Sequence, residues 1–178
     1  MRRFNAVRAR FTLLLVFTCA LCSVCRSEEP VEVTVCELLA NPDAYDHKLV
    51  KVSGQVTFAF EEFTLTSKSC PGKRGSGGIW LDYGGMMKSG AIPQGWTRRR
   101  DSALVVDGIA TSLVEDSRFS NFDTSLHKAP GAALSATLEG RYFAGKSGAP
   151  GVPEWRGFGM WGMLSLLVIQ QVLHSGVK

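Results

Sequence analysis

The feature that most constrains this chain is an alternating stretch, KLVKVSGQVTFAF, at residues 48–60. Apolar side chains recur there at every second position, which is the pattern of a strand with one buried face. Gly54 interrupts the apolar row, and a glycine inside so long a strand marks a bulge or a sharp coil. A strand that bends in this way can pair on both sides within a small barrel. Glu61 and Glu62 follow at once and predict a tight reversal into a second strand, FTLTS.

The flanking sequence predicts the rest of a small antiparallel barrel. Thr34 with Glu37 three residues later is a capping box, so a short helix is predicted there, and Pro42 ends it. Further strands are predicted at GIWLDY, ALVVDGIATSLV, ALSATLEGRYFAG and LSLLVIQQVL. Irregular loops are predicted at residues 84–101 and 115–132. The sequence therefore predicts a mainly β fold of five to six strands with one short N-terminal helix and long loops, closer to a barrel than to a sandwich.

Residues 1–27 have the layout of a secretory signal peptide. Arginines crowd its start, and an uncharged apolar run at 11–25 follows them, shorter than the about 20 residues of a typical membrane-spanning helix. We expect cleavage near 25–27, which leaves a single domain at 28–178 in the periplasm or outside the cell. Lipid anchoring is the less favoured alternative, because the residues before the three cysteines of this segment suit it poorly. The uncharged C-terminal run contains two glutamines, so no transmembrane span is predicted in the mature chain.

Removal of the signal peptide changes both the charge and the cysteine content. Five arginines leave with it, so the 20 Lys and Arg of the chain fall to 15 against 16 Asp and Glu. The net charge of the mature part is then about −1, which disfavours nucleic acid as a partner. Of five cysteines only Cys36 and Cys70 remain. Two cysteines in an exported chain are more often bonded than free, so a disulfide between them is predicted.

Several of these motifs resemble known proteins. The opening VCELLANPDAYDHKLVKVSGQV is similar to that of OB-fold domains of the anticodon-binding type, in which a long first strand coils through the barrel. With FEEFTL, SCP, GIWLDY and GFGMWGMLSLLVIQQV, it resembles a group of uncharacterised exported bacterial proteins over most of residues 34–172. That group often has a histidine at the position of Met160, so no role of that histidine transfers to this chain. The resemblance implies an OB-like barrel and an envelope location, and it implies no established activity.

The residues that could bind a ligand are tryptophans and arginines. The indole rings could stack on bases or sugars, and three consecutive arginines could clamp a phosphate. The alternative for the arginine run is an ordinary solvated loop. The predicted ligand-binding residues are Trp80, Trp96, Arg98, Arg99, Arg100 and Trp155.

The sequence contains no catalytic or metal-binding signature. His47, His127 and His174 are scattered without zinc-ligand spacing, so no metal site and no cofactor are predicted. Asp82 and Asp107 lie within predicted strands, where a buried carboxylate would be the best acid–base candidate. The alternative is that both side chains face outward on their strands. No catalytic residue is therefore assigned.

Three functions are compatible with these features. The favoured function is that of a non-catalytic binding or structural domain of the envelope, with a protein, a glycan or a small ligand as its partner. An exported nuclease-like phosphodiesterase that uses the arginine run at 98–100 is one alternative. Periplasmic metal handling is the other, because Met86, Met87, Met160 and Met163 carry thioethers, which favour Cu(I).

Overall fold

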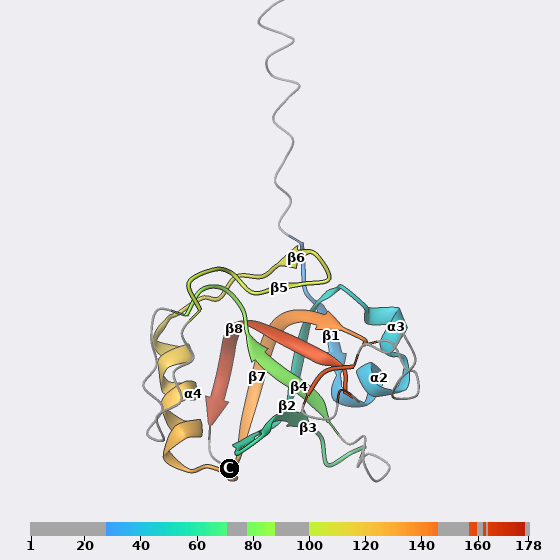
Figure 1. The fold of residues 1–178 in the computed structure, drawn as a ribbon. Helices are drawn as coiled ribbons and strands as arrows, with labels where there is room; N and C mark the ends of the chain where they lie inside the picture. Colours follow the sequence, from blue (N-terminus) through green and yellow to red (C-terminus); the bar gives the residue numbers. More distant parts are fainter. Residues whose placement is uncertain are drawn as a thin grey trace, which may run out of the picture.

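The computed structural model describes residues 28–70, 78–87, 100–145, 157–159, 162 and 164–176. Within them, a six-stranded sheet curls into a small barrel (Figure 1). Its strands, in sheet order, are β1 (Val31–Thr34), β2 (Leu49–Ala59), β3 (Glu62–Thr66), β4 (Ile79–Tyr83), β8 (Leu166–Gly176) and β7 (Ala133–Phe143). β7 also pairs with β2, so the last five of these strands close the barrel and β1 is an additional strand beside β2. The predicted signal peptide lies outside the described residues.

The barrel confirms the predicted OB-like fold class, with one difference in strand pairing. The predicted barrel is antiparallel, whereas β4 pairs in parallel with β8, and β1 pairs in parallel with β2. Parallel neighbours need a long crossover connection. The chain between β4 and β8 supplies one, because it passes through a hairpin, a helix and the whole of β7. The barrel is therefore mixed.

β2 is the long coiled strand that the alternating sequence predicts. One of its edges pairs with β7 along most of its length. Its other edge pairs with β1 before Gly54 and with β3 after it. A Cβ on Gly54 would lie 2.7 Å from both Leu65 Cδ1 and Thr66 O. Glycine is therefore needed where β2 changes partner and β3 approaches closely. The register shifts that mark bulges lie elsewhere, between β7 and β8.

The predicted N-terminal helix is divided into two short helices, α2 (Val35–Ala40) and α3 (Pro42–Tyr45). The capping box forms as predicted: Glu37 N donates to Thr34 Oγ1 at 3.1 Å, and Thr34 N donates to Glu37 Oε2 at 2.8 Å. Pro42 ends α2 and begins α3, because the first turn of a helix does not use the N–H that proline lacks.

Cys36 in α2 and Cys70 beyond β3 lie at disulfide-bonding distance, as predicted. Their Cα atoms are 5.5 Å apart, and their sequence separation is 34 residues. Cys70 also packs against the barrel core. The bridge thus ties α2 to the segment that follows β3.

The segment 115–132, predicted as an irregular loop, contains a 12-residue helix, α4 (Ser117–Lys128). Asp116 caps it, because the Asp116 carboxylate accepts a hydrogen bond from Phe119 N at 2.9 Å. Phe119, Phe122 and Leu126 share one helical face and are buried. The loop prediction was wrong because burial of this apolar face stabilises a helix, even though polar residues separate the apolar ones along the chain. Among the described residues, no helix is long and apolar enough to cross a membrane.

The stretch ALVVDGIATSLV, predicted as one buried strand, is a small hairpin. β5 (Val105–Val106) pairs with β6 (Ile109–Ala110) in a two-stranded sheet of its own. Asp107 and Gly108 form the turn with φ of 49° and 77°. Positive φ at both central residues is the requirement of a type I′ hairpin turn, which Asp-Gly satisfies. Asp107 is therefore a turn residue and not a strand residue, which corrects the prediction.

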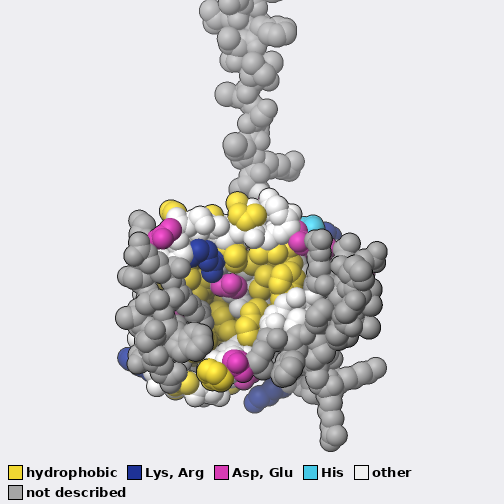
Figure 2. Space-filling view, viewed as in Figure 1, with side chains coloured by type: hydrophobic (Ala, Val, Ile, Leu, Met, Phe, Trp, Pro, Cys, Tyr) yellow, Lys and Arg dark blue, Asp and Glu magenta, His cyan; other side chains and the backbone are white. Residues whose placement is uncertain are grey.

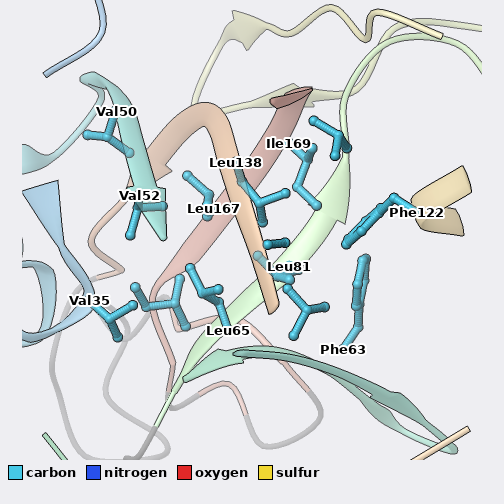
Figure 3. Close-up of a cluster of buried hydrophobic side chains, with 14 of the residues drawn as sticks. Val35, Val50, Val52, Phe63, Leu65, Leu81, Phe122, Leu138, Leu167 and Ile169 are labelled. Carbon is cyan, nitrogen blue, oxygen red and sulfur yellow. The ribbon is translucent and has the colours of Figure 1, made fainter. Parts of the chain in front are cut away.

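One hydrophobic cluster fills the barrel (Figure 3). Figure 3 shows side chains of β2, β3, β4, β7 and β8 pointing toward one another, with Phe122 of α4 and Val35 of α2 at its two sides. Tyr142 of β7 is fully buried, and its hydroxyl donates to Leu38 O at 3.2 Å. Burial raises the pKa of the Tyr142 phenol. This hydrogen bond fixes α2 on the barrel wall.

Candidate functional site

A second apolar cluster lies on the outside of the barrel, over β7 and β8. Alternate residues of β8 point into the core, which leaves Leu166 and Val168 on the outer side, where they are buried with Phe143 of β7. We call these three residues the outer cluster. The partly buried side chains that pack against it are those of Trp80, Leu104, Val106, Ile109 and Phe158.

The molecular surface is hollowed on this side. Figure 2, viewed as Figure 1, shows a depression over β4 and β8 with apolar side chains on its floor. Acidic and basic side chains stand within and beside it (Figure 2). An apolar floor with a few polar groups is the usual make-up of a ligand site. This hollow is the candidate functional site.

Trp80 is the predicted ligand-binding tryptophan that the structure describes, and it is half-buried on the outer face of β4. Its neighbours Ile79 and Leu81 point into the barrel core, so Trp80 points outward. A Cβ on Gly159 would lie 2.8 Å from the Trp80 ring. The chain at Gly159 therefore lies directly against the indole, and Trp80 presents part of its surface rather than a whole exposed face.

Asp82 and Arg100 form an ion pair two residues along β4 from Trp80. Arg100 Nη2 lies 3.0 Å from Asp82 Oδ1, and Arg100 Nη1 donates to Tyr83 O at 2.8 Å. Asp82 Oδ1 also accepts from Tyr83 N at 2.7 Å. The backbones of Arg100 and Met87 exchange two hydrogen bonds. The Arg100 side chain is therefore anchored on β4 instead of extending into solvent. Its partner Asp82 is one of the two acids considered above as acid–base candidates.

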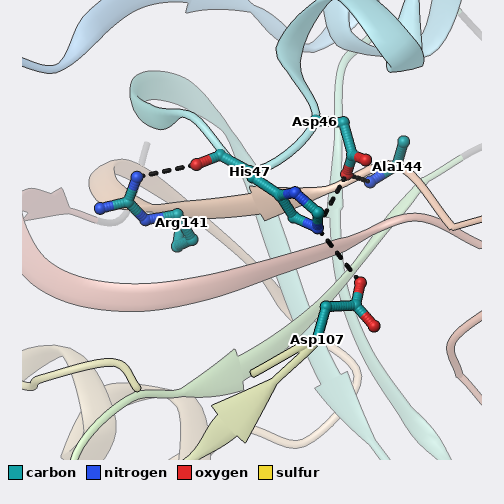
Figure 4. A network of polar contacts seen from close by, with 5 residues as sticks. All are labelled: Asp46, His47, Asp107, Arg141 and Ala144. Carbon is teal, nitrogen blue, oxygen red and sulfur yellow. Dashed lines mark hydrogen bonds and ion pairs between the residues drawn. The ribbon is translucent and has the colours of Figure 1, made fainter. Parts of the chain in front are cut away.

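A second polar network surrounds His47, which follows α3 and has a φ of 62° (Figure 4). His47 Nε2 lies 3.2 Å from Asp107 Oδ2 and 3.8 Å from Asp46 Oδ1. Asp46 Oδ1 is held in turn by Ala144 N at 2.9 Å. The imidazole also packs edge-on against Phe143 of the outer cluster, with ring centroids 5.5 Å apart. His47 thus joins α3, β7 and the tip of the β5–β6 hairpin.

Arg141 holds the opposite side of the same turn. Its Nη1 donates to His47 O at 2.7 Å, and its guanidinium contacts both carboxylate oxygens of Glu28, at 3.0 and 2.8 Å. Glu28 also accepts from Leu49 N at 3.2 Å. The hydrogen bond from Arg141 holds the pKa of the Glu28 carboxyl below its ordinary value. Glu28, the first described residue, is in this way fastened to β7.

A third polar group fastens α4 to the barrel. Tyr83 donates through its hydroxyl to Asp123 Oδ1 at 2.8 Å, and His127 Nδ1 lies 2.7 Å from Asp123 O. The His127 ring packs edge-on against Phe58 of β2. His127 Nε2 is buried without a hydrogen-bond partner. The Tyr83 and Phe58 contacts join α4 to β4 and β2, and the His127–Asp123 contact lies within α4, so we assign this group to the fold.

The predicted ligand-binding residues are only partly placed. Trp80 lies on β4, and the Arg100 side chain pairs with Asp82 of the same strand. Trp96, Arg98, Arg99 and Trp155 lie outside the described residues. No group of three or more His, Cys, Asp or Glu in the described part of the chain is arranged to hold a metal ion.

His47 is the residue that sequence reasoning missed. Its partner Asp107 is 60 residues away, and no local spacing links the two. The only local signal is the acid beside it in DAYDHK. Comparisons with protein-family models, characterised proteins and solved structures find no match to this chain.

Proposed function

We propose that residues 28–178 form an exported, non-catalytic glycan-binding domain of the cell envelope. The observation that carries this proposal is the hollow on the outer face of β4 and β8, where Trp80 and the Asp82–Arg100 pair lie beside the apolar outer cluster. The signal-peptide pattern at residues 1–27 and the resemblance to exported bacterial proteins support the envelope location.

The position of the hollow favours an oligomeric ligand with ring-shaped units. OB-fold domains bind oligonucleotides and oligosaccharides on the face of their second and third barrel strands. Those strands are β3 and β4 in this barrel, and Trp80 and Asp82 lie on the outer side of β4. The mature chain has a slightly negative net charge. This charge favours an uncharged oligosaccharide over an oligonucleotide, because nucleic-acid affinity depends on basic side chains that neutralise phosphates.

The chemistry of the hollow suits sugar hydroxyls. A partly exposed indole can contact the apolar face of a sugar ring, and a carboxylate beside a guanidinium offers both acceptors and donors. Arg100 already donates to Asp82 and to Tyr83 O, which favours recognition of neutral hydroxyls over the phosphate clamp of a phosphodiesterase.

The test is an NMR titration of the disulfide-bonded 28–178 domain with soluble N-acetylglucosamine oligomers and peptidoglycan disaccharides. We expect amide shifts at Trp80, Asp82 and Val168 that saturate. Asp82→Asn, which keeps an acceptor for Tyr83 N, should weaken binding. Phe60→Ala is the matched control, because Phe60 is 74% exposed in the turn between β2 and β3 and belongs to neither β4 nor β8. Absence of saturable shifts with every glycan, or equal weakening by both variants, would overturn the glycan assignment.

Export is tested separately. Expression of the full chain in a bacterium, followed by fractionation and N-terminal sequencing, should give an envelope protein that begins within residues 26–28. A cytoplasmic protein that keeps Met1 would contradict the proposed location.

A further inference from the structure

The β5–β6 hairpin is a small element whose position depends on what it packs against. We call residues 104–111 the strap. Its two strands have two residues each and form a sheet separate from the barrel. A hairpin of this size is not stable on its own in water. In Figure 1 the strap runs across one end of the barrel, from the β4 side toward α3.

Apolar contacts hold the middle of the strap on the outer cluster. Val106 and Ile109 pack against the cluster, while Val105 points away and is 56% exposed. The strap thus covers part of the same apolar surface that Trp80 borders. Movement of the strap would enlarge the hollow by uncovering the outer cluster.

The base of the strap is fixed by backbone hydrogen bonds to Gly85, two residues after β4 ends. Leu104 N donates to Gly85 O at 3.2 Å, and Gly85 N donates to Thr111 O at 3.0 Å. Thr111 N and Thr111 Oγ1 both donate to Leu104 O, each at 2.9 Å. Thr111 is buried. The base is therefore the more firmly held end of the strap, and motion is expected at the tip.

The tip is held by the contact between Asp107 and His47. The 3.2 Å separation of Asp107 Oδ2 and His47 Nε2 suits a hydrogen bond, and Asp46 Oδ1 lies 3.8 Å from the same nitrogen (Figure 4). The side chains of His47 and Asp107 are 44% and 39% exposed. The imidazole therefore stands between two carboxylates with access to solvent.

Basic groups near this turn point elsewhere. Arg141 engages the main-chain carbonyl of His47 and the carboxylate of Glu28, and Figure 4 shows it on the side of the turn away from Asp107. Lys48 Nζ lies over the Tyr45 ring at 5.8 Å. Among the described residues, the charged groups in contact with the imidazole edge are thus Asp46 and Asp107, both acidic.

We propose that the strap is a pH-sensitive cover of the outer cluster, with His47 as its sensor. Imidazole changes its charge between pH 5 and 8. The imidazolium forms an ion pair with the Asp107 carboxylate and holds the tip down, whereas the neutral ring offers Asp107 one hydrogen bond without an ion pair. Asp46 lies beside His47 outside the strap, so its contact with the imidazole is present whether the strap is open or closed. The strap is closed in mildly acidic solution and opens more often as the pH rises. The idea that this opening controls access of a glycan to the outer cluster rests on the proposed glycan site. The motion of the strap itself does not depend on that site.

The test is methyl relaxation-dispersion NMR on Val106 and Ile109 of the oxidised 28–178 domain, without glycan, between pH 5.5 and pH 8. The open population should rise about threefold across this range, which is the size expected for the loss of one exposed ion pair. Asp107→Asn is the matched variant. Asparagine tolerates positive φ and keeps the favoured Asn-Gly turn, so the hairpin is preserved while the charge is removed.

In Asp107→Asn the open population should be higher at pH 5.5 and nearly independent of pH. An open population in the parent domain that does not change with pH would overturn the inference, as would an unaltered pH dependence in Asp107→Asn. Glycan titration of Asp107→Asn at pH 5.5 then separates the two proposals. Strap opening without any glycan binding would refute the glycan site and leave the strap mechanism standing.

Discussion

Arg100 Nη2 lies 3.0 Å from Asp82 Oδ1, across a gap of 18 residues in the sequence. From the sequence, Arg100 belongs to a run that could clamp a phosphate, and Asp82 is a candidate acid–base residue. The structure joins the two in one ion pair. Each group neutralises the charge of the other, and Tyr83 supplies both a backbone donor and a backbone acceptor to the pair. The pair therefore fixes the geometry of the hollow.

The Asp82–Arg100 pair should contribute modestly to stability. The Asp82 and Arg100 side chains are 39% and 25% exposed, so solvent screens their attraction. A double-mutant cycle with Asp82→Ala and Arg100→Ala should give a coupling free energy of about 0.5–1 kcal/mol in urea denaturation. The coupling should shrink in 1 M salt, and a zero coupling at low salt would show that the pair does not form in solution.

Loss of the disulfide should have the largest effect among the changes considered. A closed loop with a sequence separation of 34 residues implies a stabilisation of about 3–4 kcal/mol on the chain-entropy account. Cys36→Ser with Cys70→Ser should lower the free energy of unfolding by that amount. Dithiothreitol should destabilise the parent domain equally and leave the double variant unchanged. The double variant of residues 28–178 has no cysteine, so an effect of the reductant on it would show that dithiothreitol does not act through this bridge.

The Glu28–Arg141 pair should make stability depend on pH in the acidic range. The pKa of folded Glu28 is below its ordinary value, chiefly through the hydrogen bond from Arg141. The stabilisation is therefore complete above the unfolded pKa of 4.5 and is lost as the pH falls through the lower folded value. Because Glu28 is 50% exposed, Glu28→Gln should cost no more than about 1 kcal/mol at pH 7.

This cost of Glu28→Gln should vanish near pH 3, as measured by urea denaturation at both pH values. The neighbouring exposed Glu29 provides the matched control, since Glu29→Gln should have little effect at either pH. A cost for Glu28→Gln that persists at pH 3 would contradict the electrostatic origin.

Gly54→Ala should destabilise the barrel through steric overlap. The added Cβ would lie 2.7 Å from Leu65 Cδ1 and from Thr66 O. The backbone oxygen cannot rotate away as a side chain can, so β3 has to shift, at a cost of about 1–3 kcal/mol. Thr57→Ala on the same strand is the control for strand propensity. Equal thermal denaturation midpoints for the two variants would show that close approach to β3 is not why glycine is needed.

The barrel could be predicted from the sequence because strand alternation is local. The period-two pattern around Gly54 predicted a coiled strand, and the capping box of Thr34 and Glu37 predicted the start of α2. α4 also had a local signal, an Asp116 cap followed by Phe119, Phe122 and Leu126 at helical spacing. The polar residues between them obscured it. Asp-Gly in VVDGIA was likewise a direct hairpin signal.

The candidate site could not be predicted in the same way. Asp82 meets Arg100 and His47 meets Asp107 only after the chain has closed the barrel and folded the hairpin over it. Such pairs depend on tertiary distances, which no spacing along the chain encodes. The outer cluster was similarly hidden, because Leu166 and Val168 belong to a continuous apolar run in which both faces of β8 are buried.

β1 has a consequence for how this protein behaves at high concentration. In its first half, β2 pairs with β7 on one edge and with β1 on the other. β1 is only four residues long, and its Glu32 carboxylate lies 3.2 Å from Lys51 Nζ. A short charged strand is a poor template for intermolecular pairing. A chain shortened past Thr34 would expose the backbone of β2 instead and should self-associate, so β1 protects the barrel from aggregation.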